Sequence, residues 1–207
     1  MRPRLAAVLN GLTLTGDLAR DTDALFALSG SRITREHVPR VARLAGELAG
    51  RFGLDPEQAR AAAYLHDVGG AFPRAEMVDA CSELGLEVLP EERQVPMLLH
   101  QKLSAELARE AFGVRDAALL DAVRCHTTLR AHATPLDELL FLADKIEWDR
   151  GGEPPYRAEL LAALDGGLHA GARWLLAFLY AHPEDLLIVH PWLREAWAWY
   201  GIGQGLL

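Results

Sequence analysis

Cysteines and long apolar runs are both scarce in this sequence. The two cysteines, Cys81 and Cys125, are too few for a disulfide framework, so buried free thiols in a reducing compartment are expected. The most apolar segment, residues 174–183, is too short for a transmembrane helix, which needs about 20 residues. Asn10 and Asp17 interrupt the apolar N-terminal stretch, which is unlike a signal peptide. A cytoplasmic protein without membrane spans is therefore expected.

Positive charge is also in short supply, with 21 Lys and Arg against 29 Asp and Glu and a net charge of -8. This balance argues against a protein that binds nucleic acid by neutralising its phosphates. It remains compatible with a small anionic substrate, because bound cations can reverse the local field at a site. The hydrophobic fraction of 50% and the charged fraction of 24% are ordinary for a soluble protein, and 207 residues suffice for one domain with a substantial core.

A helical period runs through most of the chain from residue 34 onward, and alternation with period two is rare. His37 recurs with Val41 and Leu48 on one helix face. Asp55-Pro56 is typical of a helix start, and Gly69-Gly70 of its end. Further helices are expected near residues 75–84, 96–112, 116–127, 135–151, 156–181 and 191–200. The sequence predicts an all-α fold, with residues 1–30 as an N-terminal extension to a domain of residues 31–207.

Histidines and aspartates form an ordered series on these helices or at their ends: His37, His66-Asp67, His100, His126 and Asp144. Imidazole and carboxylate ligands together suit iron, manganese, zinc, nickel or cobalt better than calcium or magnesium alone. Six such ligands exceed one ordinary site and are about right for two metals about 3.5 to 4 Å apart. Any one histidine is most simply a hydrogen-bonded core side chain. A carboxylate such as Asp144 in apolar surroundings, however, is costly without a cation.

With these residues the chain resembles the HD-domain superfamily of metal-dependent phosphohydrolases, whose ligands follow the order H…HD…H…H…D. More narrowly it resembles the YqeK family of symmetrical diadenosine tetraphosphate hydrolases. The matching stretches are HVPRVA at 37–42, AYLHD at 63–67, PMLLH at 96–100, HTT at 126–128, ADKIE at 143–147 with Arg150, and His190-Pro191. The resemblance extends from about residue 34 to 200 and implies an HD-domain helical bundle.

The resemblance also implies how the ligands are shared between two metals. By position, the first metal would be held by four residues, His37, His66, Asp67 and Asp144. Asp67 would bridge to a second metal held by His100 and His126. Similar proteins imply iron, with manganese, cobalt, nickel, zinc or magnesium as alternatives.

The implied reaction is hydrolysis of a dinucleoside tetraphosphate into two nucleoside diphosphates by a hydroxide that bridges the metals. Asp67 and Lys145 are the candidate catalytic residues. Lys102, Thr127 and Arg150 lie close to the ligands in sequence and are candidate phosphate contacts. For the basic residues a solvated surface charge or an ion pair is the competing interpretation, and for Thr127 a helix cap.

Three positions depart from the family pattern: Thr34 stands in place of an arginine, Gly70 of a lysine and Leu129 of a glycine. The first two changes remove cations, for which Arg35 or Arg74 are candidates to compensate. Two alternatives therefore stay open: an HD phosphohydrolase acting on a nucleoside mono-, tri- or cyclic phosphate, and a nucleotide-binding sensor with little turnover.

The expected partner is a small nucleotide, with no nucleic acid and no membrane. The aromatic C-terminal segment is most simply core, and a homodimer contact or a platform for a base are its alternatives. The other four histidines are interpreted as loop, surface or capping residues: His132, His169, His182 and His190.

Overall fold

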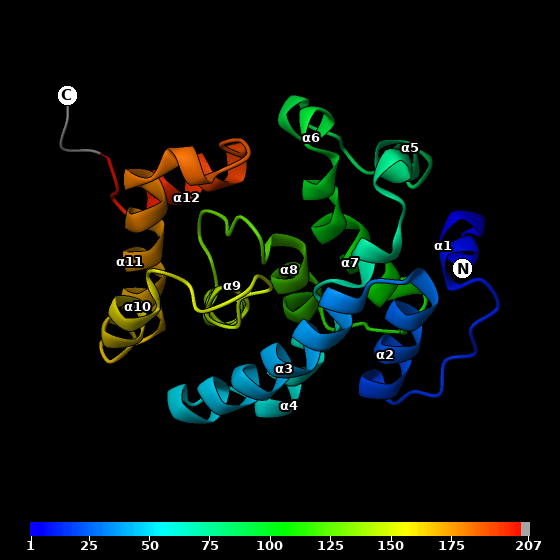
Figure 1. Ribbon diagram of the computed structural model, residues 1–207, viewed down its shortest axis with the longest axis horizontal. Coiled ribbons are helices and arrows are strands. Elements are labelled where there is room, and N and C mark those ends of the chain that lie inside the picture. The colour runs from blue at the N-terminus through cyan, green and yellow to red at the C-terminus, as the bar shows by residue number, and fades with distance from the viewer. Residues whose placement is uncertain (204–207) are drawn as a thin grey trace.

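The computed structural model in Figure 1 describes residues 1–203 and contains helices but no strands within that range. The α-helices are α1 (Pro3–Leu9), α2 (Leu18–Ser29), α3 (Arg32–Phe52), α4 (Pro56–Leu65), α5 (Met77–Glu83), α6 (Pro90–Gln94), α7 (His100–Glu110), α8 (Ala117–Cys125), α9 (Pro135–Ile146), α10 (Arg157–Leu164), α11 (Leu168–Ala181) and α12 (Pro191–Trp199). Short 3-10 helices are η1 (Val68–Ala71), η2 (Arg74–Glu76), η3 (Pro96–Leu99) and η4 (Pro183–Asp185). The all-α prediction is confirmed.

The helices gather around α7, α8 and α9 at the centre of the molecule. The long helix α3 lies along α4 and also packs against α9, while α10, α11 and α12 cluster on the opposite side from α1 and α2 (Figure 1). The central helix α9 is apolar on almost every face, and Leu139, Leu140 and Phe141 are fully buried. Its ionisable side chains lie at its two ends, with Asp137 and Glu138 in the first turn and Asp144 and Lys145 in the last.

N-terminal caps determine where the helices that carry polar ends begin. The Asp55 carboxylate accepts hydrogen bonds from two backbone N–H groups at the start of α4, at 2.9 and 3.4 Å. Asp116 caps α8 in the same way, and Thr134 caps α9. At their other ends, α4 stops immediately before His66 and α8 immediately before His126. Both histidines are therefore the C-cap residues of their helices.

Three expected helix boundaries were wrong. The helix expected at 135–151 ends at Ile146, because Glu147 leaves the helical conformation, with φ −88° and ψ 55°. The one expected at 156–181 is two helices, α10 and α11, separated at Gly166-Gly167, where Gly167 has φ +107°. The one expected at 96–112 starts as the 3-10 helix η3 and becomes α-helical only at His100.

The first thirty residues share the core of the rest of the chain. Leu5, Leu25 and Phe26 are buried in the same apolar cluster as the central helices. The guanidinium of Arg2 bonds to Glu106 on α7 at 2.6 Å. The division of the chain at residue 31 stays a prediction. Throughout the described part of the chain, every helix is too short or too polar to span a bilayer.

Candidate metal centre

The structure brings together the six side chains of the ordered series, although they come from widely separated positions: His37 within α3, His66 and Asp67 just after α4, His100 at the start of α7, His126 just after α8, and Asp144 in the last turn of α9. Two groups of three offer ligand atoms within 4.8 Å of one another, and Asp67 belongs to both groups. The side chain of Asp67 is 22% exposed, so a small ligand can reach the centre from solvent.

The carboxylate of Asp67 lies between the two groups. Its Oδ2 is 3.5 Å from Nε2 of His66, whereas its Oδ1 is 3.2 Å from Nε2 of His100 and 3.5 Å from Nε2 of His126. On the first side Asp144 completes the arrangement, with its Oδ1 3.0 Å from Nε2 of His37 and 3.6 Å from Nε2 of His66. One carboxylate with its two oxygens directed at two sets of imidazoles is the arrangement that a bridging ligand needs.

Backbone carbonyls fix the orientation of three of the imidazoles. Nδ1 of His66, His100 and His126 lies 2.6, 2.5 and 2.8 Å from the carbonyl oxygen three residues earlier in each case. Since a carbonyl only accepts, each Nδ1 carries a proton, so in the neutral ring each Nε2 presents a lone pair to the centre. This is how metal-binding histidines are usually held.

The resulting lone pairs fit a cation. Nε2 of His100 and Nε2 of His126 are 3.0 Å apart, and in these neutral tautomers neither can donate to the other. Nε2 of His66 is buried and has no hydrogen-bond partner among residues 1–203. Orphaned buried nitrogens beside carboxylates are costly unless a cation joins them. The donor set therefore fits borderline transition metals with imidazole and carboxylate ligands.

The electrostatics also favour a cation at this centre. Burial opposes the charged form of His66, yet Asp67 and Asp144 outweigh it and raise its pKa to about 9. Burial likewise opposes ionisation of Asp67, but the neighbouring imidazoles of His66, His100 and His126 hold its pKa well below its usual range. By contrast, burial and the neighbouring imidazoles lower the pKa of His126 to about 4. Two ionised carboxylates thus attract positive charge, which a metal can supply in place of a proton.

Lys145 and Thr127 lie beside the candidate ligands. Nζ of Lys145 is 2.5 Å from Oδ2 of Asp144, and the pKa of Lys145 is raised because Asp144 outweighs the effect of burial. The hydroxyl of Thr127 is 3.1 Å from Nε2 of His126 and 3.3 Å from Nε2 of His100. Both side chains can therefore contact a ligand that reaches the metal-binding atoms.

Of the other two predicted phosphate contacts, Lys102 has buried partners of its own and Arg150 is exposed. Lys102 is only 4% exposed, and its Nζ donates to Glu92 at 2.8 Å and to the carbonyl oxygen of Glu87 at 2.9 Å. Two residues along a helix turn the side chain by about 200°, so Lys102 faces away from His100. Arg150 is exposed, with its guanidinium 5.3 Å from the centre of the Trp148 ring.

Gly69, predicted only as part of a helix end, also makes a close packing contact. A Cβ atom at this position would lie 2.2 Å from the carbonyl oxygen of His100 and 2.6 Å from the backbone nitrogen of Ser104. The Gly69 N–H instead donates to the hydroxyl of Ser104 at 2.8 Å. This close approach holds the segment after Asp67 against the start of α7, and the paired glycines were its only signal in the sequence.

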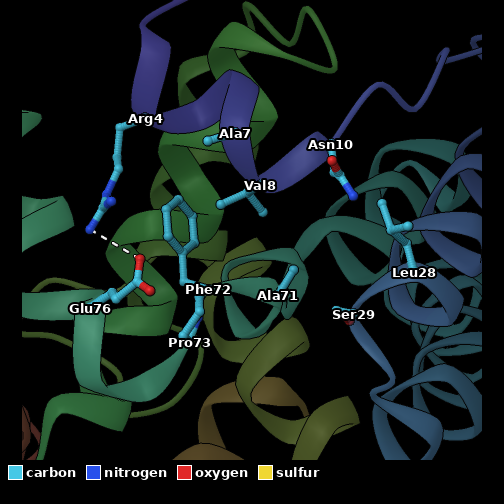
Figure 2. A pocket seen from close by; sticks show the side chains of 10 residues that line it. All are labelled: Arg4, Ala7, Val8, Asn10, Leu28, Ser29, Ala71, Phe72, Pro73 and Glu76. Atoms are coloured by element: carbon cyan, nitrogen blue, oxygen red, sulfur yellow. Dashed lines mark ion pairs between the residues drawn. The ribbon is translucent and has the colours of Figure 1, made fainter.

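A cavity of about 260 Å³ is lined by Ala71, Phe72 and Pro73, which follow the segment after Asp67 (Figure 2). It opens between α1, the end of α2 and residues 71–76, and the ion pair of Arg4 with Glu76, at 3.3 Å, lies at one side. None of the six metal-binding candidates lines it. The cavity is therefore separate from the centre.

Comparison with known proteins agrees with the geometry. A family model described as HD domain matches residues 34–149. A crystal structure of a predicted HD superfamily hydrolase involved in NAD metabolism, from Clostridium acetobutylicum, has a TM-score of 0.73 and 25% identity, and the match covers 95% of this chain and 94% of that one.

Curated relatives are similar at the sequence level. An uncharacterized protein in the pepC 5' region of Lactococcus lactis subsp. cremoris is 43% identical over 143 residues, which is 69% of this chain and 72% of that protein. A symmetrical bis(5'-nucleosyl)-tetraphosphatase of Halalkalibacterium halodurans is 30% identical over 77% of this chain and 89% of its own length. A protein of the same description from Bacillus subtilis is 36% identical over 55% of this chain and 61% of its own length.

Proposed function

This chain belongs to the HD domain family, and from that premise we propose that it hydrolyses dinucleoside tetraphosphates symmetrically, with two nucleoside diphosphates as products. The relatives from Halalkalibacterium halodurans and Bacillus subtilis are described by that activity and support the substrate class. The observation that carries the proposal is the Asp67 carboxylate, whose two oxygens face two sets of imidazoles.

We propose that two metal ions occupy the centre. Iron is the proposed metal, and manganese, cobalt, nickel, zinc or magnesium are the alternatives. His37, His66 and Asp144 would hold one, His100 and His126 the other, and Asp67 both. The orphaned Nε2 of His66 and the facing Nε2 atoms of His100 and His126 support this division. When bound, such a pair supplies an activated water as nucleophile and neutralises charge on phosphoryl oxygens.

The chain's own residues hold the substrate in this scheme. The Lys145 ammonium has three donors, of which Asp144 takes one, so it can also donate to a phosphoryl oxygen. In doing so it would stabilise the negative charge that builds as the phosphoanhydride bond breaks, which is a catalytic role. The Thr127 hydroxyl lies beside both imidazoles of the second set and can donate to the same phosphate. Arg150, further out, is the proposed contact for a distal phosphate.

A second candidate is an HD phosphohydrolase that acts on a shorter nucleotide. Gly70 contributes no cation, and the Lys102 ammonium is committed to a buried carboxylate. The centre therefore offers fewer positive side chains than the four phosphate groups of a dinucleoside tetraphosphate could engage. The relative from Clostridium acetobutylicum, described as involved in NAD metabolism, is compatible with this alternative.

Product analysis distinguishes these functions. Purified protein supplied with Mn²⁺ or Fe²⁺ is incubated with diadenosine tetraphosphate, and the products are separated by anion-exchange chromatography. ADP alone supports symmetric cleavage, whereas an equimolar mixture of AMP and ATP rejects it. Turnover only of a mono-, tri- or cyclic nucleotide favours the second candidate, and tight binding without turnover under any metal favours a sensor. Asp67→Asn tests the site, and Asp165→Asn, at an exposed carboxylate paired with Arg51, is the matched control.

A further inference from the structure

A buried ionic cluster lies outside the metal centre and has no part in the chemistry described above. Its members are Glu92, Lys102, His190 and Trp192, and we refer to them as the Glu92 cluster. Glu92 is fully buried, and Lys102 and His190 are 4% and 1% exposed. Oε2 of Glu92 accepts from Nζ of Lys102 at 2.8 Å, and Oε1 lies 3.2 Å from Nε2 of His190.

The hydrogen bonds determine the tautomer of the neutral His190 ring in this cluster. The backbone N–H of Trp192 donates to Nδ1 of His190 at 3.1 Å, which makes Nδ1 the acceptor. The proton of the neutral ring is therefore on Nε2, which donates to Glu92. The indole of Trp192 covers the Lys102 ammonium, with Nζ 4.9 Å from the ring centre. The cluster thus joins α6, α7 and the start of α12.

The segment that orients His100 runs between two members of this cluster. Glu92 lies on α6 and Lys102 on α7, and η3 connects these helices. The η3 carbonyl of Met97 accepts from Nδ1 of His100 at 2.5 Å and so sets the direction of its Nε2. Lys102 additionally holds the carbonyl of Glu87, ahead of α6, at 2.9 Å. The cluster therefore ties down both ends of the segment that aims one imidazole at the centre.

We propose that the Glu92 cluster positions His100, and that through it the C-terminal helix α12 controls the affinity of the second metal site. This inference rests on the proposed two-metal centre. The helix α12 lies outside the residues matched by the family model, which end at 149. Replacing a buried ion pair by apolar residues is often neutral for stability, so stability alone does not explain charges at this position. A geometric role in ligand orientation does.

The test compares metal binding in a double variant and in a control with a single substitution. Lys102→Met with Glu92→Gln removes both charges together, so neither is left unpaired in the core. Glu106→Gln is the control, because Glu106 is also a buried acid on α7, 5% exposed, and pairs with Arg2, Arg109 and Arg124 instead. Mn²⁺ titration followed by electron paramagnetic resonance counts two binding steps, and thermal unfolding measures stability separately. The double variant is expected to weaken the second step by about 10- to 100-fold and leave the first unchanged.

His190→Asn keeps the test decisive if the double variant does not fold. The Asn side-chain oxygen can still accept from the N–H of Trp192, while the contact with Glu92 is lost. The dissociation constant of the second Mn²⁺ is expected to rise less than in the double variant. Glu106→Gln is expected to keep both binding steps unchanged. If both Mn²⁺ binding steps are unchanged in His190→Asn and in the folded double variant, the positioning role is overturned, while the proposed metal pair stands. A wild-type protein that binds fewer than two Mn²⁺ ions overturns the proposed metal pair and this inference with it.

Discussion

A methyl group at residue 69 would disturb the candidate metal centre more than its size suggests. In Gly69→Ala the new Cβ would lie 2.2 Å from the carbonyl oxygen of His100, whereas ordinary contacts begin at 3.4 Å. The segment after Asp67 must then move away from α7 by roughly 1 Å. Because Asp67 lies two residues before the methyl group and His100 carries the obstructing carbonyl, the movement separates two proposed ligands. Their Oδ1–Nε2 distance is 3.2 Å at present.

Two effects of different size follow from that displacement. Overpacking of this kind lowers the free energy of unfolding by about 1–3 kcal/mol, which leaves most domains folded. A displacement of about 1 Å at a catalytic centre can lower the rate by about 100-fold. We therefore expect Gly69→Ala to be folded, with a modestly lower melting temperature and a much larger loss of metal-dependent hydrolysis.

The adjacent glycine supplies the matched control. No atom lies within 4 Å of a Cβ built at Gly70, and neither glycine has a positive φ. Gly70→Ala should therefore keep both stability and activity near those of the wild type. The assay is the initial rate of nucleotide hydrolysis at saturating Mn²⁺, together with differential scanning calorimetry. Equal rates for Gly69→Ala and Gly70→Ala would refute the argument that this contact sets the Asp67–His100 geometry.

Three further predictions test other parts of the structure. Asp67→Ala should lose at least one metal, measured by elemental analysis after gel filtration, and all hydrolysis; a fully active variant excludes Asp67 as a ligand. Leu129→Gly should lower the unfolding free energy in urea by about 2–4 kcal/mol, since losing a fully buried leucine outweighs the roughly 1 kcal/mol of strain at its φ of +57°; a more stable variant shows that strain dominates. Although burial raises it, hydrogen bonds from Thr15 and Gly16 lower the pKa of Asp21. The Asp21 carboxylate therefore contributes stability above the unfolded pKa of 3.8, and this contribution is lost as the pH falls through the lower folded pKa. Asp21→Asn should accordingly reduce the fall of the melting temperature at acid pH. An unchanged fall contradicts this assignment.

Local signals in the sequence predicted the helix starts and the order of the six candidate ligands. Asp55 and Pro56 specify a helix start within three residues, because capping depends only on neighbouring backbone N–H groups. His66 follows at the end of that helix, so its position at a helix C-terminus could be predicted from the sequence. The separation of α10 from α11 was not predicted, because apolar residues continue on both sides of the Gly166-Gly167 break.

The parts of the site that depend on tertiary packing could not be read from the sequence. Lys102 has the charge of a phosphate contact, and only its burial against Glu92 shows that it has another partner. His190 was interpreted as a loop, surface or capping residue. It does cap α12, but its second nitrogen reaches a carboxylate 98 residues away in the chain. Long-range contacts of this kind decide which polar residues face a site.

The most direct measurement of the central proposal is anomalous X-ray scattering from crystals grown with Mn²⁺. The proposal predicts two anomalous peaks about 3.5 to 4 Å apart among the six side chains, with one oxygen of Asp67 directed at each peak. A single peak, or two peaks of which only one contacts Asp67, would contradict it.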